Sequence, residues 1–264
     1  MNLFVNLPLR YIHNDTVYLD FFIEHRLQPE LGLDVIAIEH FDHGWHRSIA
    51  AALQQAHLAC AIHFPFFDLQ PGSIDNGILQ ATRHRLVSAC AVAKIYSPCH
   101  LIAHAGFTDV YDEFYEEWLN RSKATWQVLG KEWPDHPPIY LENVYEETYH
   151  PIADVLARIN NPGFGSCFDT GHWYSFSQGA RLKNLEEWIT GLAGYVRHLH
   201  LHDNDGSFDQ HRGLGQGSVP WEELFTVLRR SHVWPSITLE PHSREGLEHS
   251  LAFINKHPEW FPLA

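Results

Sequence analysis

Four histidines and three aspartates lie within fifteen residues, Arg197-His198-Leu199-His200-Leu201-His202-Asp203-Asn204-Asp205-Gly206-Ser207-Phe208-Asp209-Gln210-His211. The first half alternates, so His198, His200 and His202 would line one face of an extended strand. A buried strand does not leave imidazoles without partners, because each unsatisfied polar group costs about 1–3 kcal/mol. We therefore predict a strand whose histidines meet a metal ion or a hydrogen-bond network. A solvated, histidine-rich loop after a strand is the alternative that this stretch alone leaves open.

The composition is that of a globular protein with one large domain or two small ones. Of the 264 residues, 45% are hydrophobic, and no apolar run approaches the roughly 20 residues that span a bilayer. The N-terminus lacks the positive region of a signal peptide, which predicts a cytoplasmic protein. The cysteines show no Cys-x-x-Cys spacing and are expected to be small buried residues. They are Cys60, Cys90, Cys99 and Cys167.

The charge of the chain argues against a nucleic-acid partner. There are 18 Lys and Arg against 32 Asp and Glu, a formal net charge of −14, and no basic cluster offsets it. Surfaces that bind nucleic acids normally present Lys and Arg to the phosphates. We expect a small-molecule substrate and no membrane partner. The sequence gives no indication of the oligomeric state.

Strand-like and helix-like segments alternate along the chain. Short β-rich runs are predicted over 3–9, 34–40, 60–66, 100–106, 138–144, 164–172, 196–204 and 236–242. Segments with helical apolar spacing are predicted over 17–28, 45–58, 78–95, 111–129, 154–159, 185–192, 221–228 and 247–254. Eight such alternations predict an α/β fold, a single (β/α)8 TIM barrel over residues 1–264. A doubly wound open sheet is the alternative, because the pattern does not show closure.

Polar residues gather where the predicted strands end. The carboxyl ends of barrel strands meet in one ring, and active sites of this fold are built there. Aromatic residues after these strands would either wall the site or pack its loops. The polar residues are His63, His104, Glu142, Asp169, His172, His200 and Glu240, with Glu39, His40, Asp42 and His43 expected after the second strand. The aromatic residues are Phe64, Phe66, Phe67, Trp173, Tyr174 and Phe176.

Three carboxylates would crowd together on this ring, those of Glu142, Asp169 and Glu240. Like charges a few ångströms apart raise each other's pKa unless a cation lies among them. Carboxylate and imidazole ligands suit Zn²⁺, Mn²⁺, Fe²⁺ or Co²⁺, and ligand type alone does not choose among these ions. We predict a divalent metal cofactor, Zn²⁺ or Mn²⁺, with one to three ions.

Three motifs resemble the xylose-isomerase-like TIM-barrel superfamily, which includes endonuclease IV and many sugar isomerases and epimerases. They are Leu-Glu-Asn at 141–143, Phe-Asp-Thr-Gly-His at 168–172 and Asp-Gln-His-Arg-Gly-Leu-Gly-Gln-Gly at 209–217. The resemblance extends from the third predicted strand to the eighth. It implies a metal-dependent barrel enzyme.

The resemblance implies two different ligand sets. In the isomerase branch a single ion would be held by Glu142, Asp169, His200 and Glu240, and the two glutamates would exchange protons with substrate carbons. In the endonuclease IV branch nine residues hold three zinc ions, and all nine positions are filled in this sequence. The three implied groups are His63, His104 and Glu142; Glu142, Asp169, His200 and Glu240; and His172, Asp209 and His211.

The complete set of nine residues favours a multinuclear site. Clustered ions suit phosphoester hydrolysis, so we predict a metal-dependent hydrolase of a small phosphorylated sugar or nucleotide-like substrate. Glu142 would bridge two ions and act as base. Arg10, Arg212 and Arg244 would meet the anionic group unless they are solvated surface residues. The alternatives are a single-metal sugar (phosphate) isomerase or epimerase, with Glu142 and Glu240 as acid and base, and a non-catalytic metal-binding barrel.

Overall fold

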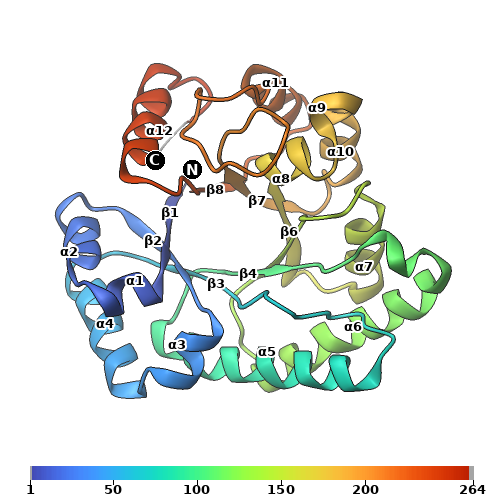
Figure 1. Ribbon diagram of the computed structural model, residues 1–264, viewed down its shortest axis with the longest axis horizontal. Coiled ribbons are helices and arrows are strands. Elements are labelled where there is room, and N and C mark those ends of the chain that lie inside the picture. Colours follow the sequence, from blue (N-terminus) through green and yellow to red (C-terminus); the bar gives the residue numbers. More distant parts are fainter. Residues whose placement is uncertain (1, 262–264) are drawn as a thin grey trace.

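Eight parallel strands form a closed barrel in the computed structural model, which describes residues 2–261 (Figure 1). Each strand pairs with the next one along the chain, and β1 pairs with β8 through Leu3 opposite Ile237. This closure confirms the predicted (β/α)8 barrel over an open sheet. The strands are β1 (Leu3–Pro8), β2 (Gln28–Gly32), β3 (Ala61–His63), β4 (Leu101–His104), β5 (Ile139–Glu142), β6 (Phe164–Asp169), β7 (Val196–Leu201) and β8 (Ser236–Leu239).

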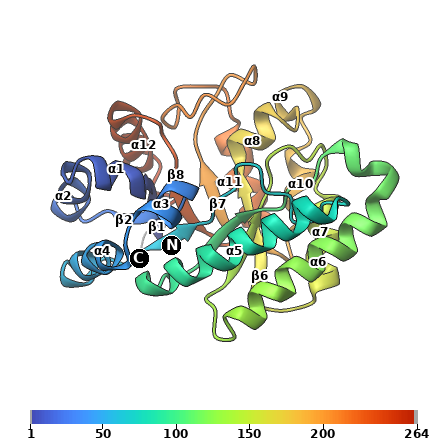
Figure 2. The same cartoon turned by 60° about the horizontal axis from the view of Figure 1, so that its bottom comes forward.

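Helices surround the barrel (Figure 2). Their apolar side chains are buried in the hydrophobic core. On α6, for example, Trp118, Leu119, Trp126 and Leu129 are buried with helical spacing. Within residues 2–261, no helix combines the length and the apolar character that crossing a membrane requires. The helices are α1 (Leu9–Asn14), α2 (Val17–Glu24), α3 (Val35–His40), α4 (His43–Gln55), α5 (Asn76–Tyr96), the 3-10 helix η1 (Asp109–Phe114), α6 (Tyr115–Glu132), α7 (His150–Ile159), α8 (Thr170–Ser175), α9 (Gly179–Leu182), α10 (Leu185–Gly191), α11 (Trp221–Arg230) and α12 (Arg244–Lys256).

The second strand lies earlier in the chain than predicted. A strand over 34–40 is wrong, because β2 spans Gln28–Gly32 and α3 begins at Val35. The Asp34 carboxylate accepts a hydrogen bond from the amide of Ala37 (2.9 Å) and so caps α3. The β-branched residues of α3 favour a strand by propensity, but the cap at Asp34 overrides that weak preference. Pro29, a residue rare inside strands, obscured the true β2.

This shift removes four predicted residues from the end of the second strand. Glu39 and His40 lie on α3, where Glu39 pairs with Arg85 (2.6 Å). Asp42 caps α4, since its carboxylate accepts from the amides of Gly44 and Trp45. His43 is the first residue of α4. The expectation that these residues follow the second strand directly is therefore wrong.

The cysteine prediction is confirmed in part. All four thiols are free, and Cys60, Cys90 and Cys167 are buried. Cys99 is exposed, because it lies in the turn before β4 rather than within a strand.

Candidate metal centre

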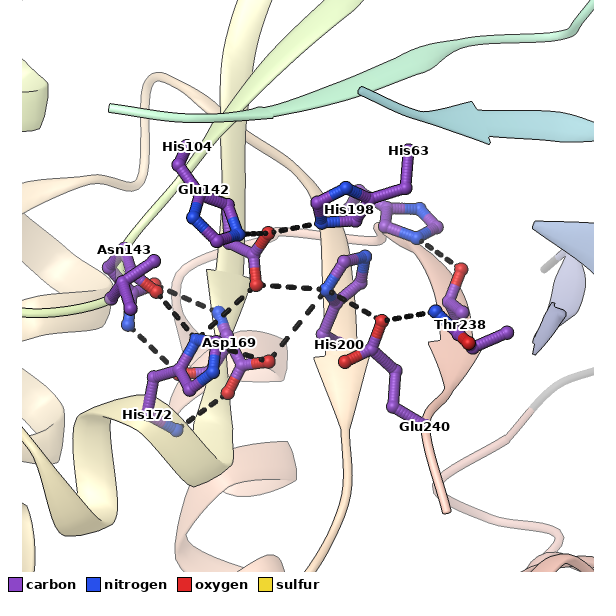
Figure 3. A network of polar contacts seen from close by, with 12 residues as sticks. His63, His104, Glu142, Asn143, Asp169, His172, His198, His200, Thr238 and Glu240 are labelled. Carbon is purple, nitrogen blue, oxygen red and sulfur yellow. Dashed lines mark hydrogen bonds and ion pairs between the residues drawn. The ribbon is translucent and has the colours of Figure 1, made fainter. Parts of the chain in front are cut away.

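The parallel register of the barrel brings the predicted residues to one height. His104 and Glu142 are the last residues of β4 and β5 and stand opposite each other. Asp169, the last residue of β6, stands opposite His200 of β7. Since β3 also ends in a histidine, His63, the strand ends place carboxylates and imidazoles side by side (Figure 3).

Glu142 lies at the middle of this group. Its Oε2 is 3.0 Å from Nε2 of His63 and 3.3 Å from Nε2 of His104. Its Oε1 is 3.1 Å from Nδ1 of His200 and 3.3 Å from Nδ1 of His172. One carboxylate therefore faces two sets of imidazoles, one with each oxygen. This arrangement suits the bridging role predicted for Glu142.

Three carboxylates converge on a single nitrogen of His200. Nδ1 of His200 is 3.1 Å from Glu142 Oε1, 3.3 Å from Glu240 Oε1 and 3.7 Å from Asp169 Oδ2. All four residues are buried. Buried carboxylates this close together repel unless positive charge lies among them. Two glutamates, an aspartate and an imidazole are hard and intermediate ligands that fit a divalent ion such as Mn²⁺, Co²⁺ or Zn²⁺.

A second group forms beside the first, around Asp209. Its Oδ2 is 2.8 Å from Nε2 of His211 and 3.5 Å from Nε2 of His172. Its Oδ1 is 3.5 Å from Nδ1 of His202. The potential ligand atoms of these four residues all lie within 4.8 Å of one another. The loop after β7 thus folds back over the strand ends and brings Asp209 and His211 into the site.

His202 is the functional candidate that the predicted set of nine leaves out. It is fully buried, and its Nε2 is 3.1 Å from Asp169 Oδ1. Within residues 2–261, His202 Nδ1 and Asp209 Oδ1 are buried atoms without a hydrogen-bond partner. Two such atoms facing each other are what a bound cation would satisfy. The alternation along β7 was the signal, because it places His202 on the same face as His200.

The loop that carries Asp209 is held by Asp203. The carboxylate of Asp203 accepts hydrogen bonds from the amides of Gly215 (2.9 Å) and Val219 (3.1 Å) and from Nε1 of Trp221 (3.0 Å). These three bonds hold the returning part of the loop, at Gly215, Val219 and Trp221, against its beginning at Asp203. Since backbone amides prefer a full carboxylate as acceptor, Asp203 determines where the loop returns.

The surroundings fix the charge of the site. Burial alone would raise the pKa of Glu142, but the imidazoles of His200 and His104 hold it well below its usual range. Burial would lower the pKa of His172, whereas Asp169, Asp209 and Glu142 raise it well above its usual range. The Glu142 carboxylate thus favours its ionised form and the His172 imidazole its protonated form. A divalent ion would displace those protons on binding.

The structure brings together all nine residues that the sequence marks as ligands. Their role as ligands stays a prediction. The nine residues are His63, His104, Glu142, Asp169, His172, His200, Asp209, His211 and Glu240.

The three arginines proposed for an anionic group each have a carboxylate partner. Arg10 lies 3.6 Å from Asp34, Arg212 lies 3.1 Å from Asp205, and Arg244 lies 3.1 Å from Glu248.

The six aromatic residues expected after the strands differ in their burial, and Phe67 is 73% exposed. Phe64, Trp173 and Tyr174 are buried and belong to the hydrophobic core. Phe66 is 39% exposed and stacks on His104, with ring centroids 4.4 Å apart. Phe176 stacks on His172 at 5.5 Å. Aromatic faces therefore flank the two imidazoles on the solvent side of the site.

Comparison with known proteins agrees with this fold. Residues 26–257 match the family described as xylose isomerase-like TIM barrel. An uncharacterized protein of Methanocaldococcus jannaschii, MJ1311, is 23% identical over 210 residues, which are 74% of this chain and 71% of that protein.

Two solved structures share the whole barrel. A D-tagatose 3-epimerase-like protein has a TM-score of 0.80 and 19% identity, with 98% of this chain and 97% of that chain covered. D-psicose 3-epimerase with D-tagatose, from Clostridium cellulolyticum H10, has a TM-score of 0.75 and 12% identity, with 98% and 99% covered. At these identities the likeness shows the fold, and the chemistry has to be argued from the residues.

Proposed function

The chain belongs to the xylose isomerase-like TIM barrel family, and on that premise we propose that it is a divalent-metal-dependent sugar isomerase or epimerase. One observation carries this proposal. The Oε1 atoms of Glu142 and Glu240 lie 3.1 and 3.3 Å from the same atom, Nδ1 of His200. Two carboxylates at one point of the strand-end ring can serve as the acid and the base that proton exchange at carbon requires.

The ion would be held by Glu142, Asp169, His200 and Glu240. When bound, it supplies Lewis-acid polarisation of substrate oxygens. The rest of the chemistry belongs to the side chains. Isomerisation and epimerisation remove a proton beside a carbonyl group and return one, so a base and an acid must flank the carbon. We assign these roles to Glu142 and Glu240, and Asn6 Nδ2 donates to Glu240 Oε1 (3.3 Å) and orients it.

A neutral sugar suits the surroundings better than a phosphorylated one. The chain carries a formal charge of −14, which disfavours an anionic substrate. The three candidate arginines are already paired with carboxylates. Phe66 and Phe176 offer aromatic faces beside the polar ring, as small-molecule sites commonly do. We therefore infer a ketose without a phosphate group as the substrate class, and the similar solved structures named as sugar 3-epimerases support this choice.

The phosphoester hydrolase predicted from the sequence becomes the second candidate. Its supporting observation is the additional group of His172, His202, Asp209 and His211, which would hold a further ion. The similarity to solved sugar epimerases supports the isomerase or epimerase better than the hydrolase. The cytoplasmic location and the domain extent of 1–264 stay predictions.

A single set of measurements separates the two candidates. Protein purified without added metal is analysed for ions per chain, and then assayed with ketoses in deuterium oxide and with phosphomonoesters and phosphodiesters. An epimerase incorporates solvent deuterium at the epimerised carbon. If a single ion at Glu142 and Glu240 is enough for catalysis, the Asp209→Ala variant should keep the epimerase activity. Phosphoester cleavage that Asp209→Ala and His172→Ala both abolish, with no ketose turnover, would replace the proposal with the hydrolase.

A further inference from the structure

A polar layer lies inside the barrel, directly below the ring of strand ends. Glu30 of β2 stands opposite Ala61, two residues before His63 at the end of β3. Thr238 of β8 stands opposite His200 and two residues before Glu240. Glu30 and Thr238 are fully buried. Barrel interiors are usually filled by branched apolar side chains, and a buried carboxylate is costly unless it is paired.

One oxygen of Glu30 is fixed by β8. The Thr238 hydroxyl donates to Glu30 Oε2 at 2.6 Å. Since this hydroxyl has only one proton, it accepts from His198, whose Nε2 is 2.8 Å away (Figure 3). His198 Nδ1 is in turn 2.6 Å from the Ser236 hydroxyl. A chain of hydrogen bonds therefore holds the Glu30 carboxylate in one orientation.

The other oxygen of Glu30 faces the underside of His200. Oε1 of Glu30 is 3.1 Å from Nε2 of His200. Within residues 2–261, both atoms are buried and neither makes an aligned hydrogen bond. The opposite nitrogen of the same ring, Nδ1, faces Glu142, Asp169 and Glu240. One imidazole thus separates the buried Glu30 from the group of carboxylates that would hold the ion.

We propose that Glu30 is a positioning residue for the metal centre: its Oε1 accepts from Nε2–H of His200 and so presents Nδ1 of that ring to the ion. Histidines that ligate metals commonly donate their other N–H to a carboxylate, which fixes the ring and its tautomer. Glu30 touches neither substrate nor ion and acts only through His200.

Metal affinity tests this role without any sugar. Apoprotein is titrated with Co²⁺ alone, and binding is followed by visible absorption. Glu30→Gln should weaken Co²⁺ binding about 10- to 100-fold and alter the spectrum of the bound ion. His100→Gln is the matched control, because His100 is also buried and its Nε2 lies 3.8 Å from the other carboxylate oxygen, Glu30 Oε2. Wild-type affinity and spectrum in Glu30→Gln, or an equal loss in the control, would overturn the proposal.

A second measurement uses the wild-type protein, in case Glu30→Gln does not fold. Nitrogen-15 NMR of zinc-loaded protein, with the His200 signals identified by their loss in His200→Gln, should show zinc on Nδ1 and a proton on Nε2. Zinc on Nε2 would contradict the role of Glu30. Because the inference rests on the metal centre of the proposed function, the outcomes must be separable. If Co²⁺ binding depends on Glu30 but the protein turns over no ketose, the proposed isomerase or epimerase activity is refuted, while the positioning role of Glu30 is retained.

Discussion

His202 occupies the space in which a side chain at Gly171 would lie. A β-carbon at position 171 would overlap Cε1 of the His202 ring. That ring has no room to move, because it is fully buried and stacks on His211 with centroids 3.8 Å apart. Glycine at 171 therefore lets His202 reach Asp169 on one side and Asp209 on the other.

Gly171→Ala is expected to lower the free energy of unfolding by about 1–3 kcal/mol, because the added methyl group overpacks a fixed ring. Urea unfolding of both proteins measures the change. Gly194→Ala is the matched control, since a β-carbon there meets nothing within 4 Å. Equal stability of the two variants would show that the His202 ring can move to make room for the added methyl group.

Removing either proposed proton-transfer group should abolish most of the ketose turnover. Glu142→Gln and Glu240→Gln are each expected to lower kcat about 10²- to 10⁴-fold at saturating metal, the range for general acid–base groups. Deuterium incorporation measured by NMR should fall in parallel. Glu186→Gln, an exposed change on α10, serves as the control. Full activity of Glu240→Gln with its metal content intact would exclude Glu240 as acid or base.

Removal of metal should lower thermal stability, because the carboxylates around His200 repel once their cation is gone. An ion present at 100 times its Kd contributes about 2.7 kcal/mol. For a chain of this size that corresponds to a Tm decrease of roughly 5–10 °C on chelation. Scanning calorimetry with EDTA, and again after Mn²⁺ or Zn²⁺ is restored, measures it. An unchanged Tm would mean that the purified protein held no ion at these residues.

Glu146 should make stability depend on pH. Its carboxylate is buried and accepts from the amides of Val144 (2.6 Å) and Phe107 (3.1 Å), and burial raises its pKa to about 7. Because the folded pKa lies above the unfolded value of 4.5, the folded state binds the proton more tightly. This stabilisation is complete below the unfolded pKa and is lost as pH rises through the folded one.

The free energy of unfolding should therefore decrease between pH 4.5 and 7 by up to about 3 kcal/mol more in the wild type than in Glu146→Gln. Urea titrations at several pH values measure the two slopes. The exposed neighbour gives the control, since Glu147→Gln should keep the wild-type slope. Parallel slopes for wild type and Glu146→Gln would place the Glu146 pKa near its ordinary value.

Local patterns identified the barrel and most of its ring of polar residues. The alternation along β7 put His198 and His200 on one face, and the parallel strands did place Glu142 beside His104 and Asp169 beside His200. The second strand was misplaced because propensity is a weak signal where a cap competes. Asp34 capping α3 outweighed the β-branched residues that follow it.

By itself, the sequence determined the fold class and the candidate ligands, because strand periodicity and the meeting of parallel strand ends are properties of short segments. Only the tertiary structure decided what surrounds those ligands. Glu30 meets Thr238 across 208 positions of sequence, and His202 joins Asp209 only because Gly171 leaves space and Asp203 returns the loop. Such contacts depend on packing between distant segments, and no local pattern encodes them.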